Sequence, residues 1–126
     1  QMIHEEILRK IIRDNDSSKI DTQRHRNETG TLSWSESRIQ LRDFISDLDS
    51  DCLLDLLAMM DYGRNICAMN QKASYQEFLK WRRNFDNKPF TDQEKKEKAA
   101  YLLEKSSLSE YLRAVLPIYK IVEFKF

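Results

Sequence analysis

Three aspartates at alternate positions, Asp47, Asp49 and Asp51, resemble the opening of a calcium-binding loop. Such a loop needs glycine at its sixth position and a bidentate glutamate at its twelfth. Cys52 and Ala58 occupy these two positions, so the run does not fit a calcium site. We expect the three carboxylates to lie where two helices join, close to the positive N-terminal end of the second helix.

Other residues that bind metals or perform catalysis are sparse. His4 and His25 have no His or Cys neighbour at ligand spacing, and Cys52 and Cys67 supply at most two ligands. The chain contains no Gly-x-Ser-x-Gly, His-Glu-x-x-His or glycine-rich phosphate loop. The sequence therefore predicts no metal, no cofactor and no catalytic activity.

Arginine and aromatic residues stand close together in the second half of the chain. Arg and Trp are the residue types that dominate protein-binding hot spots. If Gly63 caps a helix, Arg64 projects from the following turn and could bind a partner's carboxylate or phosphate. The alternative is an intramolecular bridge to an aspartate of a neighbouring element, which would tether the turn. The candidate partner-binding residues are Arg64, Trp81, Arg82 and Arg83.

Charge is unevenly distributed, although 21 basic and 21 acidic residues cancel. Residues 42–61 hold six aspartates and one arginine, a net charge of −5, whereas residues 64–90 hold six basic and two acidic residues, a net charge of +4. This layout could steer a partner or align two copies; alternatively, the two segments attract each other within the fold. The predicted acidic patch consists of Asp47, Asp49, Asp51 and Asp55.

The elements that position these residues are predicted to be helices. The 126 residues include two glycines and two prolines, too few for the tight turns of a sandwich or barrel, and apolar residues recur at helical spacing. The sequence predicts an all-α fold, a compact bundle of five to six short helices. The expected helices cover residues 3–13, 34–48 and 51–62 and follow Ser74, Thr91 and Ser107.

Helix ends are predicted from capping residues. A hydroxyl residue with glutamate three positions later fits the capping box, in which each of the two residues bonds an amide of the other. Gly63 is expected to end the third helix in a left-handed conformation. That helix is apolar over a wide arc, so we expect it to be the most buried. Capping boxes are expected at Ser33, Ser74, Thr91 and Ser107.

The expected organisation has four parts: an N-terminal helix at 1–13, a polar linker at 14–32, a helical domain at 33–116 and a C-terminal tail at 117–126. The linker is expected because few large apolar residues occur in it, and long loops of this kind are either mobile or functional. The N-terminal helix could pack on the third helix, or it could be exchanged between subunits through this linker. Gly30 is its expected turn point.

The tail begins at Pro117, which interrupts the preceding helix. Val122, Phe124 and Phe126 alternate with charged residues, which favours an extended tail. A helix that continues through the proline is the alternative. In either case the apolar tail is expected to pack on the domain or on a second chain.

Two leucine-rich stretches carry a family resemblance. Residues 53–65 read LLDLLAMMDYGRN, and YLL at 101–103 is followed by LSEYL at 108–112. Over about residues 41–116 the chain resembles a bacterial family of domains of unknown function. Its members share a Leu-rich helix, a Leu-Gly-Arg-Gly-Asp turn and a Tyr-Leu-Leu segment that runs into a Tyr-Leu pair. The resemblance implies an all-helical fold and carries no activity.

The chain departs from this family pattern around the turn. Tyr62 stands where leucine is usual, Asn65 stands where glycine is usual, and the aspartate that should follow is missing. Phe78 stands where tryptophan is expected.

These observations favour a small non-catalytic module that binds or inhibits a partner protein, by analogy with immunity proteins, antitoxins and phage-encoded inhibitors. A DNA-binding regulator is the alternative, because residues 72–88 could contact phosphate. The acidic third helix disfavours it, as does the lack of a helix with clustered Arg, Asn and Gln. An enzyme with a site at Asp61, Tyr62 and Arg64 is the third hypothesis.

Location and assembly are predicted from composition. No stretch approaches 18 uncharged apolar residues, so no membrane span is expected. The charged N-terminal residues do not fit a signal peptide, and we expect the native chain to begin at Met2. Two cysteines, both expected to be reduced, favour a cytoplasmic protein. A homodimer is compatible with the sequence.

Overall fold

The computed structural model describes the backbone of residues 2–123 and the side chains of residues 2–120. Helices account for all the regular structure in this part of the chain, which confirms the all-α prediction. They are α1 (Glu5–Thr29), α2 (Glu36–Ser46), α3 (Ser50–Ala68), α4 (Tyr75–Arg83), α5 (Asp92–Leu103), α6 (Leu108–Val115) and α7 (Pro117–Glu123).

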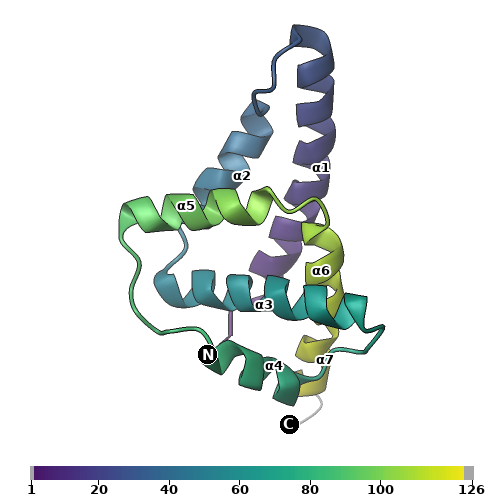
Figure 1. Ribbon diagram of the computed structural model, residues 1–126, viewed down its shortest axis with the longest axis vertical. Helices are drawn as coiled ribbons and strands as arrows, with labels where there is room; N and C mark the ends of the chain where they lie inside the picture. The colour runs from purple at the N-terminus through teal and green to yellow at the C-terminus, as the bar shows by residue number, and fades with distance from the viewer. Residues whose placement is uncertain (1, 124–126) are drawn as a thin grey trace.

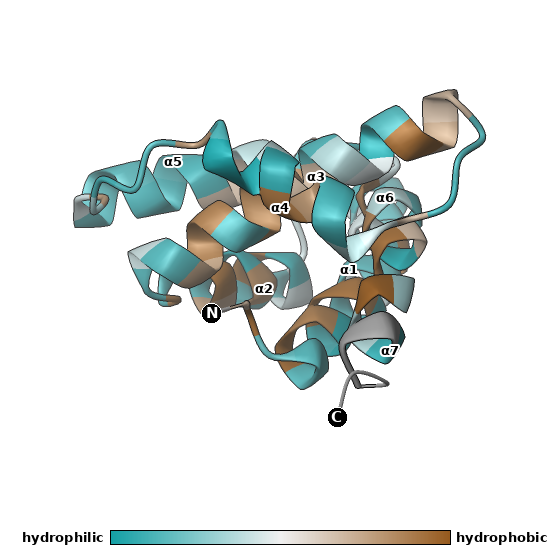
Figure 2. Ribbon diagram, turned by 90° about the horizontal axis from the view of Figure 1, so that it is seen from below, coloured by the Kyte–Doolittle hydropathy of each residue, from teal (hydrophilic) through white to brown (hydrophobic). Residues whose placement is uncertain are grey.

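Helix α3 is the centre of the fold. Residues 53–60 are all buried, as its wide apolar arc predicts. It contacts α4, α5 and α6, with α5 and α4 on opposite sides of it in Figure 1. Helices α1 and α2 pack side by side, and one end of this pair projects from the body. In Figure 2 hydrophobic residues gather where the helices meet, and the outer turns of α5 are hydrophilic.

Helix α1 is much longer than the sequence predicted. The expected linker at residues 14–32 is wrong for 14–29, which are helical. The buried face of α1 does not end where its apolar residues end, because Asn15, Ser18 and Thr22 continue it at helical spacing. A pattern search for apolar residues misses this face because its members are polar.

Partners on other helices explain why these polar residues are buried. The Asn15 amide donates to Ser109 Oγ in α6 at 2.7 Å, and the hydroxyls of Thr22 and Ser35 share a hydrogen bond of 2.9 Å. Helix α1 ends at Gly30, which has φ 71°, as its expected role as a turn point suggests. Since α1 packs on α2 and α6 of the same chain, the structure contains no linker that would release residues 3–13.

The helix starts follow the predicted caps in part. Thr91 forms the full capping box of α5, and Ser74 caps α4 by accepting a backbone hydrogen bond. Helix α2 is capped by Ser35 instead of Ser33, and Ser107 makes no side-chain capping bond. Ser35, and not Ser33, caps α2 because its hydroxyl is also bonded to Thr22 in α1, a contact that the local sequence does not reveal.

Helix α6 ends at Val115 and a separate helix begins at Pro117, which confirms the predicted interruption. The expected extended tail is wrong for the residues of α7, and the alternative is right about the helical conformation but not about one continuous helix. Proline is tolerated in the first turn of a helix because its missing N–H has no partner there. The buried Tyr119 hydroxyl donates to the carbonyl of Ile3 at 2.7 Å, so α7 packs on the N-terminal segment. The side chain of Val122 and residues 124–126, with Phe124 and Phe126, lie outside the described residues.

Gly63 lies inside α3 and does not end it, so its predicted role as a C-cap is wrong. A Cβ atom at this position would lie 2.2 Å from the carbonyl oxygen of Tyr111 in α6. The glycine is therefore required by the close approach of two helices. Helix α3 continues to Ala68, and Asn70 then adopts a positive φ of 50°.

Gly63→Ala is expected to lower the free energy of unfolding by about 1–3 kcal/mol, because the added methyl forces α3 and α6 apart. This loss should appear although alanine is the better helix former. Urea unfolding measures it. Gly30→Ala is the control: its Cβ meets nothing within 4 Å, so it should cost only the backbone strain, about 1 kcal/mol. A Gly63→Ala protein as stable as the wild type would contradict the role of this close approach.

Candidate partner-binding site

Two aspartates of α3 hold α4 in place. Arg82 Nε donates to Asp55 Oδ1 at 2.7 Å, and Trp81 Nε1 donates to Asp61 Oδ2 at 3.1 Å. The acidic segment and the basic segment of the sequence are thus joined within the fold at these two points. Attraction of opposite charges inside the molecule, the alternative to steering of a partner, accounts for the Arg82–Asp55 pair.

Asp55 does not belong to an exposed acidic patch, and its assignment there is wrong. It is 5% exposed, and its second oxygen accepts the backbone N–H of Ile3 at 2.8 Å. Both donors compensate for the loss of water around the carboxylate. The other three members of the predicted patch are exposed: Asp47, Asp49 and Asp51.

Asp61 orders the exposed end of this face. Its Oδ1 accepts from Arg64 Nη2 at 2.5 Å, while its other oxygen holds Trp81. Trp81 is half-buried, and its ring centroid lies 5.7 Å from that of Tyr62. Arg64 lies within α3, so its predicted place in a turn after Gly63 is wrong. Its ion pair with Asp61 joins two residues of the same helix.

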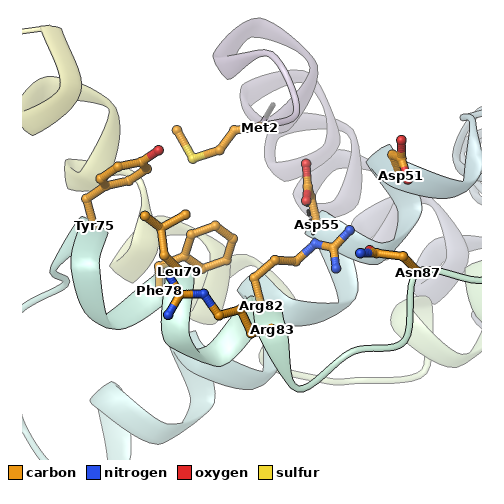
Figure 3. A pocket seen from close by; sticks show the side chains of 9 residues that line it. All are labelled: Met2, Asp51, Asp55, Tyr75, Phe78, Leu79, Arg82, Arg83 and Asn87. Atoms are coloured by element: carbon orange, nitrogen blue, oxygen red, sulfur yellow. Dashed lines mark hydrogen bonds and ion pairs between the residues drawn. The ribbon is translucent and has the colours of Figure 1, made fainter.

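A cavity of about 530 Å³ opens between α3, α4 and the N-terminal segment. Figure 3 shows Met2, Tyr75 and Leu79 on one side of it and the Arg82–Asp55 pair on the other. Arg83 also lines the cavity. It is exposed and forms no ion pair with the described residues. The cavity thus offers an apolar surface beside an available cation.

Asp49 has a structural role as the N-cap of α3. Its Oδ1 accepts the backbone N–H of Cys52 at 2.8 Å, and this hydrogen bond lowers the pKa of Asp49 below its usual value. Burial raises the pKa of the Cys52 thiol to about 11, and the nearby carboxylate of Asp49 adds to the shift. The Cys52 thiol is therefore neutral at physiological pH.

Arg38, which sequence reasoning did not identify, lies away from this face, where α2 packs on α1. Arg38 is buried there among polar groups of α1 and α5. Its position three residues before the buried Leu41, on the inner side of α2, is the signal that could have identified it.

The described residues contain no group of three His, Cys, Asp or Glu side chains that could hold a metal ion. Within residues 2–123, no helix combines the length and the apolar character needed to cross a membrane. No protein-family model matches the chain, and comparisons with curated proteins and with solved structures also give no match.

Asp49→Ala is expected to lower the free energy of unfolding by about 1 kcal/mol at neutral pH, the usual effect of removing an N-cap. Because folding lowers the pKa of Asp49, its stabilisation is complete above the unfolded-state pKa of about 3.9. It is lost as the pH falls through the folded-state value. Unfolding at several pH values should show the difference from wild type shrinking in acid. Asp47→Ala is the control, and an equal effect of both would contradict the cap.

Asp55→Ala is expected to cost about 3 kcal/mol or more, because it leaves Arg82 without its carboxylate and the Ile3 amide without an acceptor. Asp55→Asn should cost less, since it keeps one acceptor oxygen. The exposed Asp51→Ala is the control and should change stability by about 0.5 kcal/mol or less. Chemical denaturation measures all three. Similar stabilities of the Asp55 and Asp51 alanine variants would exclude the anchoring role.

Proposed function

We propose that the protein is a small non-catalytic interaction module that binds or inhibits a partner protein through the exposed side of α3 and α4. The observation that carries the proposal is the pair Arg64 and Trp81, which share the carboxylate of Asp61. Arg and Trp side chains dominate binding hot spots. Side chains that are already ordered lose less conformational entropy on binding, which strengthens association.

The neighbouring cavity supports the same proposal and indicates the chemistry of the partner. Its apolar side, with Tyr75 and Leu79, suits an apolar side chain of the partner. Arg83, which has no carboxylate from the described residues, suits an acidic group. The partner is therefore expected to present an apolar residue next to an acidic one.

The alternative, a DNA-binding regulator, receives less support from this surface. Binding to DNA draws its affinity from cations that neutralise phosphates. Arg64 and Arg82 already have carboxylate partners in α3, which leaves fewer cations available on this face. The cytoplasmic location, the kinship with the bacterial family and a role as homodimer remain proposals that rest on the sequence.

The test is a tagged pull-down from a lysate of the source cells, with and without nuclease, followed by binding measurements with the purified partner. Arg64→Ala and Trp81→Ala should each weaken binding by about tenfold or more, the effect of a hot-spot residue. Arg24→Ala, an exposed residue of α1, is the matched control and should bind as wild type does. Circular dichroism must show intact helices in each variant.

Two results would contradict the proposal. Partners that disappear after nuclease treatment would favour the nucleic-acid alternative. A stoichiometric protein partner whose affinity is the same for the Arg64, Trp81 and Arg24 variants would show that another surface makes the contact.

A further inference from the structure

A second cavity, of about 340 Å³, lies where α1, α2 and the connection from α5 to α6 meet. In Figure 1 this connection passes beside the α1–α2 pair, away from α4. Three separate segments of the chain contribute cations or polar groups to its wall. The lining residues that bear on ligand binding are Lys19, Arg26, Trp34, Arg38, Glu104 and Ser106.

Arg38 is the buried cation of this cavity, at 5% exposure. Its Nη1 donates to Asn15 Oδ1 at 2.6 Å and Ser18 Oγ at 3.1 Å, and its Nη2 donates to the carbonyl of Leu103 at 2.5 Å. All these acceptors are neutral, and no carboxylate among the described residues pairs with Arg38. A buried charge without a counter-charge is costly, so an anion would be favourable here.

The Nε atom of Arg38 is available for such an anion. It makes no hydrogen bond to the described residues, and no fully buried side-chain nitrogen among them lacks a partner. It follows that Nε is not completely buried and keeps some contact with solvent. A guanidinium with a free N–H on its edge can donate to an oxyanion.

Two further cations border the cavity without ion pairs inside the described chain. Lys19 Nζ donates to the carbonyl of Ser106 at 2.5 Å, and Arg26 Nε donates to the carbonyl of Ser33 at 3.3 Å. Burial lowers the pKa of Arg38, and repulsion by Arg26 lowers it further, so these two charges lie close enough to oppose each other. A bound anion would offset this repulsion by attracting both charges.

We propose that this cavity binds the phosphate group of a small molecule. Three cations against the single carboxylate of Glu104 leave an excess of two positive charges, which suits a doubly charged oxyanion. The volume lies in the range of small-molecule sites. Trp34, whose ring centroid is 5.6 Å from Arg38 Cζ, supplies an aromatic wall for the rest of the molecule. This site is independent of the partner-binding face.

The test uses the fluorescence of Trp34. The chain has two tryptophans, so Trp81→Phe leaves Trp34 as the single reporter. Inorganic phosphate, pyrophosphate and ribose 5-phosphate are titrated separately at constant ionic strength, with potassium chloride as the reference salt. A saturable change and a Tm that rises with concentration are expected for the phosphates and not for chloride. Tighter binding of ribose 5-phosphate than of phosphate would identify a phosphorylated small molecule as the ligand, and equal binding would identify phosphate itself.

The decisive variant is Lys19→Gln with Arg26→Gln, because Arg38 also supports the fold and its replacement could unfold the protein. The double variant should keep its helices and weaken binding by about tenfold or more, since each lost charge removes a charge-assisted hydrogen bond. Arg24→Gln removes a charge from the same helix outside the cavity and should bind as before. A fluorescence change that does not saturate with phosphate at constant ionic strength would overturn the proposal. Phosphate binding by the double variant that is as tight as that of the wild type would do the same.

Discussion

The carboxylate of Asp55 is the constraint on which the candidate binding face depends. It is buried in the otherwise apolar middle of α3, and it accepts one hydrogen bond from Arg82 and one from the Ile3 amide. Ile3 in turn accepts from Tyr119 in α7. One charge therefore fixes α4 and the N-terminal segment against α3, and α7 joins the same junction. The cavity with Arg83 exists because these elements meet there.

Arg38 is the second buried charge, and the contrast between it and Asp55 is informative. Asp55 has a cationic partner, whereas Arg38 contacts neutral groups among the described residues: amide, hydroxyl and carbonyl acceptors and the ring of Trp34. Neutral acceptors satisfy hydrogen bonds but do not neutralise the charge. The charge of Asp55 is thus compensated by a residue of the chain. The charge of Arg38 is not compensated by a carboxylate among the described residues, so the cavity beside it has a positive electrostatic potential. This difference is the physical reason to expect a ligand at the second place.

The sequence predicted the parts of the fold that apolar periodicity determines. The all-α class and the buried centre at residues 53–60 follow from that pattern. The helix through residues 14–29 could not be found in this way, because its buried residues are polar and their partners lie in other helices. The role of Gly63 was missed for a similar reason, since the contact that requires glycine is with the backbone of Tyr111 in α6.

The candidate site was predicted by residue type and not by geometry. Arg and Trp in the basic segment indicated the face, but the availability of each cation depends on tertiary pairing. That pairing leaves Arg83 without a carboxylate partner among the described residues. Among the residues that the structure describes, the Asp55 and Arg38 junctions share no hydrogen-bonding residue, so substitutions in one are expected to act independently of the other. If both proposals hold, a partner bound at α3 and α4 would therefore leave the α1–α2 cavity free for a separate ligand.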